Sequence, residues 1–249
     1  MACAGTRASA SRRCWAVRLV APGEFRLRLC CGKRGRLRFL SHLEYSHAIE
    51  RGARRAGLPY AVTQGFSPHM KLAFGPALPV GTEGEREYVD VWLTRYLPVA
   101  EVIESLAASL APELAPAEAI YVGDKDPSLG AACTIGVYEV DIRGGGVTES
   151  RVREALDEVV SEGELRVEHK GKNKVFDLAI SLPKGVMVES CGAEGVKAAV
   201  VTRMGQNGSL RPDALVAYAL SRSGITGAVT LVTRLDTLIE EEGEFRRPV

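Results

Sequence analysis

FRLRLCCGKRGRLRFLSHLEYSHAIERGARRAG (residues 25–57) contains one strand pattern followed by one helix pattern. Apolar and basic residues alternate over residues 25–32, which is typical of a half-buried strand. Ser41 and Glu44 have the S-x-x-E spacing of a capping box, in which each side chain bonds the backbone of the other residue. Gly57 provides a C-terminal stop. The stretch therefore predicts a strand, a connection and a helix.

The residues that follow extend this order to a complete unit. The unit continues with strand patterns at 69–75 and 87–94, a helical apolar stripe at Val99, Val102, Ile103, Leu106 and Leu110, and a last strand pattern at 117–123. The order over residues 25–123 is thus β-α-β-β-α-β. A polar segment rich in turn residues, 124–132, reads as a linker.

The same order returns between residues 133 and 240. Its strand patterns lie at 133–143, 174–183, 197–204 and 227–238, and its helix patterns at 149–163 and 211–224. Residues 165–174 predict an added edge strand or hairpin. Two such units predict an α+β protein with tandem ferredoxin-like domains, each an antiparallel sheet with two helices on one face. Residues 1–24 and 241–249 are expected to be a poorly ordered extension and a solvated tail.

The bulk composition narrows the class of protein. The chain has 249 residues, of which 46% are apolar and 25% charged, and its net charge is +1. No run of about 18 apolar residues is present, so a membrane partner is not expected. The six cysteines form no C-x-x-C pair, which disfavours a zinc or iron–sulfur site in this chain. We therefore expect reduced thiols, no bound metal or cofactor and a cytoplasmic location.

A local excess of basic residues is the strongest functional signal. Residues 33–55 hold seven basic side chains against two acidic ones, a difference of +5 in a chain whose total is +1. On the predicted helix, His47, Arg51, Arg54 and Arg55 share one face, and Arg36 and Arg38 lie just upstream. Guanidinium groups match phosphate oxygens, so this face is a candidate phosphate-binding surface. The alternative is a solvated helix face.

The segment 64–75 has a different character. Glycines and prolines define sharp turns there, and the donors between them are Gln64, Ser67, His69 and Lys71. Such a loop could cradle a phosphate or a splayed nucleotide. Neither a Walker motif nor a dinucleotide fingerprint occurs in it. The alternative is a rigid connection that only packs against itself.

A second basic cluster lies in the other half of the chain. Lys170, Lys172 and Lys174 alternate with other residues, so a strand places them on one side. They are a candidate second anchor for the same polyanion. A solvated hairpin tip is the alternative interpretation.

Three of the four histidines lie in the first half and raise the question of catalysis. His42 and His47 are five residues apart, so they diverge by about 140° around a helix and do not form a metal pair. His47 or His69 could take the proton of a ribose 2′-hydroxyl, with Arg51 and Lys71 stabilising the phosphorane. Surface histidines without a catalytic role are the alternative.

Residues 35–93, GRLRFLSHLEYSHAIERGARRAGLPYAVTQGFSPHMKLAFGPALPVGTEGEREYVDVWL, resemble the radical SAM-linked proteins. This family consists of domains fused to, or encoded beside, cobalamin-binding radical SAM proteins. KGKNKVFDL at 170–178 resembles a later element of the family. The resemblance implies a radical SAM partner that uses S-adenosylmethionine, an iron–sulfur cluster and cobalamin. It assigns no activity to the domain itself.

Together these patterns favour a non-catalytic accessory module that binds tRNA or rRNA and presents it to a radical SAM enzyme. Tandem ferredoxin-like domains are also similar to the CRISPR-associated RNA-processing enzymes, so a metal-independent endoribonuclease is one alternative. That analogy concerns the fold, which does not determine function. A protein-binding adaptor without affinity for nucleic acid is the other alternative.

Overall fold

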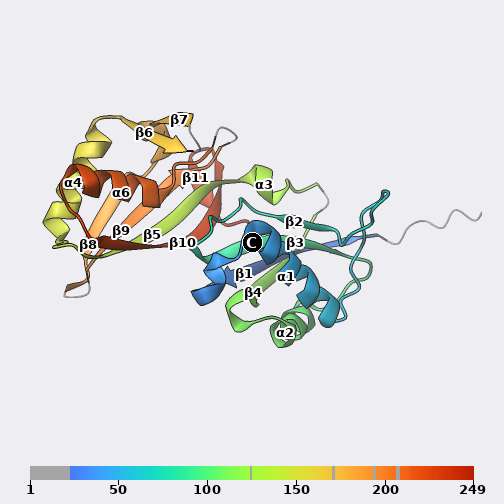
Figure 1. Ribbon diagram of the computed structural model, residues 1–249. Coiled ribbons are helices and arrows are strands. Elements are labelled where there is room, and N and C mark those ends of the chain that lie inside the picture. The colour runs from blue at the N-terminus through green and yellow to red at the C-terminus, as the bar shows by residue number, and fades with distance from the viewer. Residues whose placement is uncertain (1–22, 124, 170–171, 193–194, 206–207) are drawn as a thin grey trace, which may run out of the picture.

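The computed structural model describes residues 23–249 except 124, 170–171, 193–194 and 206–207 (Figure 1). Residues 1–22, which make up most of the predicted N-terminal extension, lie outside the described part. The protein has a mixed α+β fold in which helices pack on a large, mostly antiparallel sheet. No described helix is both long and apolar enough to cross a membrane.

The first half follows the predicted order of elements. It comprises β1 (Phe25–Lys33), the 3-10 turn η1 (Gly35–Phe39), α1 (His42–Arg55), β2 (Leu72–Phe74), β3 (Glu83–Leu93), α2 (Val99–Ser109), the 3-10 turn η2 (Pro112–Leu114) and β4 (Pro116–Val122). The capping box is confirmed, since the Ser41 side chain accepts from the Glu44 backbone and the Glu44 carboxylate accepts from the Ser41 backbone. Gly57 has a positive φ of 66°, as a helix C-terminal stop requires.

The second half departs from the prediction in its middle. It comprises α3 (Leu129–Ala132), β5 (Cys133–Gly144), α4 (Glu149–Ser161), β6 (Glu164–His169), β7 (Lys172–Asp177), α5 (Leu178–Ser181), β8 (Val186–Ser190), β9 (Val196–Arg203), α6 (Pro212–Arg222), β10 (Ala228–Glu241) and β11 (Glu244–Arg246). The hairpin expected at 165–174 is present as β6 and β7. Of the strand predicted at 174–183, residues 174–177 belong to β7 and the remainder is wrong, because Asp177 caps the short helix α5 there and the strand that pairs with β9 is β8.

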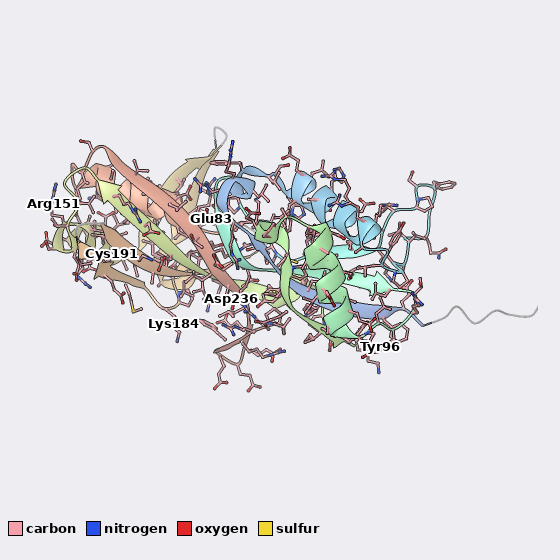
Figure 2. All side chains as sticks on the ribbon, turned by 90° about the horizontal axis from the view of Figure 1, so that it is seen from below. Glu83, Tyr96, Arg151, Lys184, Cys191 and Asp236 are labelled. Carbon is pink, nitrogen blue, oxygen red and sulfur yellow. The ribbon has the colours of Figure 1, made fainter. Side chains whose placement is uncertain are left out.

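Both halves contribute to one sheet. Among the described residues nine strands join it, in the order β4-β1-β3-β10-β5-β9-β8, with β2 paired to β3 and β11 to β10. The halves meet where β3 and β10 run parallel, at Thr233–Glu83 and Arg234–Gly84. Glu83 and Asp236 lie at this central junction, whereas Tyr96 and Arg151 lie at opposite ends of the molecule (Figure 2).

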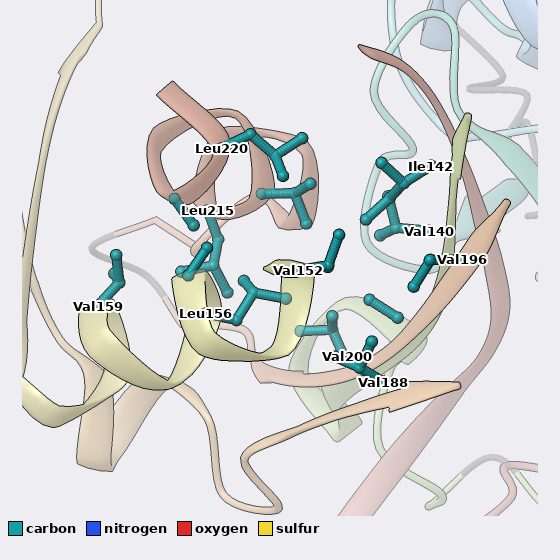
Figure 3. Close-up of a cluster of buried hydrophobic side chains, with 14 of the residues drawn as sticks. Val140, Ile142, Val152, Leu156, Val159, Val188, Val196, Val200, Leu215 and Leu220 are labelled. Carbon is teal, nitrogen blue, oxygen red and sulfur yellow. The ribbon is translucent and has the colours of Figure 1, made fainter. Parts of the chain in front are cut away.

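Each half has its own apolar core. In the first half, the apolar face of β1 and β3 packs against α1 and α2. The strand residues are Leu27, Leu29, Val89 and Val91, and the helix residues are Tyr45, Ile49, Val102 and Leu106. In the second half, Val152, Leu156 and Val159 of α4 and Leu215 and Leu220 of α6 pack on Val140, Val196 and Val200 of the sheet (Figure 3). Burial of these side chains is the main stabilising contribution.

The segments expected to be a linker and a tail cover the other face of the first half. Arg26 donates to the carbonyl oxygens of Asp126 (2.7 Å) and Pro127 (3.0 Å), and Arg28 donates to that of Pro248 (3.0 Å). Leu129 of α3 is fully buried against Cys30 of β1. These segments are therefore packed parts of the fold, because they supply acceptors and apolar cover to a sheet face that carries buried arginines.

Candidate nucleic-acid interface

A groove runs along α1 between η1 and η2. The α1 residues that line it are spaced i, i+3, i+4, i+7 and i+11, so they share one helix face, and they are Glu44, His47, Ala48, Arg51 and Arg55. Leu37, in the middle of η1, Leu40, which caps its C-terminal end, and Leu110, Ala111 and Leu114, from the segment that follows α2, complete the lining. The groove holds about 410 Å³ and opens to solvent.

The three arginines predicted on α1 have different surroundings. Arg51 is exposed and has no ionic or hydrogen-bond partner among the described residues. Arg55 donates twice to the carbonyl oxygen of Ser109, at 3.2 and 2.5 Å, and so satisfies a C-terminal carbonyl of α2. Arg54 bends away from the groove to Glu50 (2.6 Å) and the Tyr60 hydroxyl (2.9 Å). Arg51 is therefore the cation most available to an anionic ligand.

The two arginines of η1 also differ. Arg36 is exposed and lacks a partner within the described part of the chain. Arg38 pairs with Glu83 at 2.9 Å and stacks its guanidinium on Phe39, 4.8 Å from the ring centroid. Its positive charge is thus partly balanced at the junction between the halves.

The 62–70 loop is closed at its base by a bridge between Val62 and Met70. The Thr63 amide donates to the His69 carbonyl at 2.8 Å, and His69 Nδ1 lies 3.1 Å from both the Thr63 hydroxyl and the Ser67 carbonyl. Gln64 and Ser67 are exposed at the tip. The imidazole of His69 therefore braces the loop.

Lys71 follows the loop and contacts Glu24, the residue before β1, and Trp92 of β3. Its ammonium group pairs with Glu24 at 2.5 Å and lies 4.9 Å from the centroid of the Trp92 ring. A cation held by a carboxylate and an aromatic face has little free capacity for a phosphate. Lys71 therefore lies apart from the groove along α1.

The hairpin lysines belong to the second half. Lys174 is exposed on β7 and lines a small apolar pocket with Phe176 and Leu210. Lys172 begins β7, and Lys170 lies outside the described residues. Of these lysines, Lys174 is the one whose side chain the structure describes, and it lines a pocket with residues 209–211 and Ala214, which is separate from the groove along α1.

The histidines do not form a common centre. His47 lines the groove beside Arg51, while His69 is bound within its loop. His42 packs edge-on against Phe74, with ring centroids 5.3 Å apart. Among the described residues no contact joins His47 to His69, and no group of three metal-ligating side chains occurs.

A second, smaller cavity lies beneath the start of α1. Lys33, His42, Tyr45 and Glu87 line it together with the 74–78 segment. Lys33 donates to the Leu40 carbonyl at 2.7 Å. The Tyr45 hydroxyl is buried and has no nitrogen or oxygen partner among the described residues. The cavity holds about 20 Å³, which is room for about one water molecule and too little for an organic substrate.

Burial controls the ionisation of the groups around this cavity. It lowers the pKa of Lys33, and it raises the pKa of Tyr45 well above its ordinary value, with the neighbouring Cys31 thiol adding to the effect. The carboxylate of Glu87 is held by the buried Arg234, whose Nε donates to it at 2.9 Å. This constellation is a buried structural network rather than an open site.

Sequence reasoning missed the apolar wall of the groove. Leu37 and Leu40 stand among basic residues, the sequence pattern assigns Leu110 to the apolar stripe of the second helix, and Leu114 follows that stripe. Their convergence on α1 depends on how η1 and η2 fold back, and no local pattern encodes that contact. The i, i+3, i+4 spacing of Glu44, His47 and Ala48 was the available signal.

The fold and the groove define a class: a mixed α+β protein with one sheet shared by two halves and a cationic groove beside α1. The family model described as "Uncharacterized protein conserved in bacteria (DUF2344)" matches residues 26–212. The chain therefore belongs to this family. The match spans α1, the groove and most of the second half. No curated protein matches the chain.

Two solved structures match the chain with low sequence identity. A chain from the "Crystal Structure of a Cbf5-Nop10-Gar1 Complex" is 13% identical, with a TM-score of 0.48; the match covers 87% of this chain and 50% of that one. This protein thus corresponds to about half the length of that chain. An unknown protein from Galdieria sulphuraria is 12% identical, with a TM-score of 0.25, and the match covers 86% and 99% of the two chains.

Proposed function

We propose that the protein is an accessory module that binds tRNA or rRNA and presents it to a radical SAM enzyme. The resemblance of residues 35–93 to radical SAM-linked proteins supports the partner. That partner would supply the S-adenosylmethionine, iron–sulfur and cobalamin chemistry, and this chain would supply the surface that holds the RNA. Each half is proposed to be a ferredoxin-like unit, which the strand orders β4-β1-β3-β2 and β10-β5-β9-β8 support. A cytoplasmic location is part of the proposal.

The observation that supports the proposal is how the arginines of η1 and α1 are paired. Arg51 and Arg36 are exposed, and neither has a partner in the described part of the chain, whereas most other arginines of this half hold carboxylates or carbonyls. Arg51 lies one helical turn from Arg55, so its unpaired guanidinium is repelled by a second positive charge. A phosphate backbone would relieve that repulsion and accept the guanidinium donors.

Salt-dependent RNA binding tests the proposal. The Arg36→Glu/Arg51→Glu variant should bind tRNA more weakly, and the slope of log affinity against log salt should fall by about 1 for each arginine. The matched control is Arg143→Glu, which reverses an exposed charge on β5 in the other half and should leave affinity and slope unchanged. Equal loss in both variants, or no loss in either, would contradict a specific role of the groove.

The same experiment separates the two alternatives. If the protein cleaves RNA in the presence of EDTA, and the cleavage is lost in His47→Ala or His69→Ala, the protein is an endoribonuclease rather than an accessory module. Absence of RNA binding by the unaltered protein, together with stable co-purification of a protein partner, would identify an adaptor. Intact RNA bound in a salt-dependent manner supports the accessory role.

A further inference from the structure

The groove along α1 combines two chemistries that a phosphate-binding surface alone does not need. Leu37, Leu40, Leu110 and Leu114, with Ala48 and Ala111, form an apolar lining. The cationic groups Arg51 and Arg55 lie along the same helix face as His47. Its volume of about 410 Å³ falls within the range of about 300–1,000 Å³ that small-molecule sites span. The groove therefore has an apolar body with positive charge beside it.

The groove is built by the packing of α1 on the end of α2. A Cβ added at Gly52 would lie 2.4 Å from Leu110 Cδ2, so the glycine lets Leu110 approach the helix closely. Arg55 holds the Ser109 carbonyl from the same helix. These two contacts position Leu110 and Ala111 as one wall, and η1 supplies the other.

Charge distinguishes among possible occupants. Glu44 is the acidic residue of the lining, and its carboxylate already accepts from the Ser41 amide (2.8 Å) and the Ser41 hydroxyl (2.7 Å). Arg51 has no such partner in the described chain. An occupant with an apolar face and an attached anion satisfies both parts of the groove. A nucleotide has both features, because the base presents an apolar face and the phosphate a negative charge.

Building on the proposed function, we infer that this groove receives one unpaired nucleotide of single-stranded RNA. The base packs on the leucine lining and the adjoining phosphate binds Arg51. In duplex RNA the bases are stacked and paired, so their faces cannot enter a groove; in loops and ends they can be splayed out. The site therefore selects single-stranded over double-stranded RNA.

Filling the groove without changing its charge tests this inference. Ala111→Trp should weaken binding of a single-stranded RNA oligonucleotide by about tenfold, because the base can no longer bury its face against the leucine lining. Binding of a duplex of the same length and the salt slope should stay unchanged. Ala100→Trp, an exposed position in the first turn of α2, is the matched control and should bind like the unaltered protein. Ala48→Phe fills the groove from α1 and serves if Ala111→Trp folds poorly.

Failure of this inference is distinguishable from failure of the proposed function. Salt-dependent RNA binding with equal affinity for single strand and duplex, unaffected by Ala111→Trp, would overturn the nucleotide groove and leave the accessory role standing. Lack of any RNA binding would overturn both. Loss of a co-purified protein partner in Ala111→Trp, with RNA binding intact, would assign the groove to a peptide instead.

Discussion

Asp90 is fully buried on β3 and holds two arginines of the neighbouring strand. Its carboxylate accepts from Arg26 Nη2 at 2.6 Å and from Arg28 Nε at 2.7 Å, and both arginines are at most 5% exposed. The alternation of residues 25–32 predicted the strand correctly. It did not predict that its basic face is buried, because the covering carbonyls of Asp126 and Pro248 are distant in the sequence.

Replacing Asp90 by Asn should destabilise the fold strongly. The change leaves two buried guanidinium groups without a counter-charge, which typically costs about 3–5 kcal/mol. Urea unfolding at pH 7 measures the loss. Glu85→Gln is the matched control on the same strand, since the Arg34–Glu85 pair (2.7 Å) is about 40% exposed and should contribute about 0–1 kcal/mol. Equal effects of the two substitutions would contradict the buried role of Asp90.

At the scale of the element, α1 was the most predictable part of the molecule. Its capping box and glycine stop are local, so the sequence was sufficient to place both ends within about one residue. The side-chain directions were less predictable. Arg54 lies on the same helix face as His47 by spacing, yet its guanidinium contacts Glu50 and Tyr60. The position of a long side chain's charged group depends on its hydrogen-bond partners as well as on the direction of its Cα–Cβ bond.

Ser41→Ala should lower the free energy of unfolding by about 1 kcal/mol at pH 7, the usual contribution of an N-cap hydroxyl. The Ser41 hydroxyl and amide lower the pKa of Glu44. A carboxyl whose pKa is lower in the folded state stabilises above its unfolded pKa and loses this contribution as pH falls through the folded pKa. The difference between Ser41→Ala and the unaltered protein should therefore shrink in acid. A difference independent of pH between 7 and 3 would exclude this coupling.

At the scale of the whole molecule, the two halves are joined by more than a linker. β3 and β10 lie side by side, and Arg234, which is 1% exposed, pairs with Glu87 of the first half and donates to the Pro76 carbonyl at 2.7 Å. The Tyr88 hydroxyl of the first half donates to the carboxylate of Asp236 in β10 at 2.9 Å. Unfolding of one half would therefore leave a strand edge and buried charged side chains of the other half without their partners.

The halves should consequently unfold in one transition. In a Trp15→Phe background, Trp92 is the remaining tryptophan and reports on the first half. Trp92 fluorescence should change at the same urea concentration as the hydrogen exchange of peptides from β9, which reports on the second half. Glu87→Ala, which leaves Arg234 unpaired at the junction, should lower the common midpoint or separate the two. Glu240→Gln, which breaks the Arg203–Glu240 pair within the second half, is the control and should keep the midpoints together.

The sequence by itself determined the kinds of most elements, the limits of α1 and the basic excess near it, because these depend on side-chain periodicity, capping and charge within a few residues. The tertiary structure decided the rest. It joined the halves through β3 and β10, buried Arg26 and Arg28, and brought Leu37 and Leu110 to opposite sides of Arg51. Such features depend on contacts between distant segments, whose free energy is gained only when the whole chain folds.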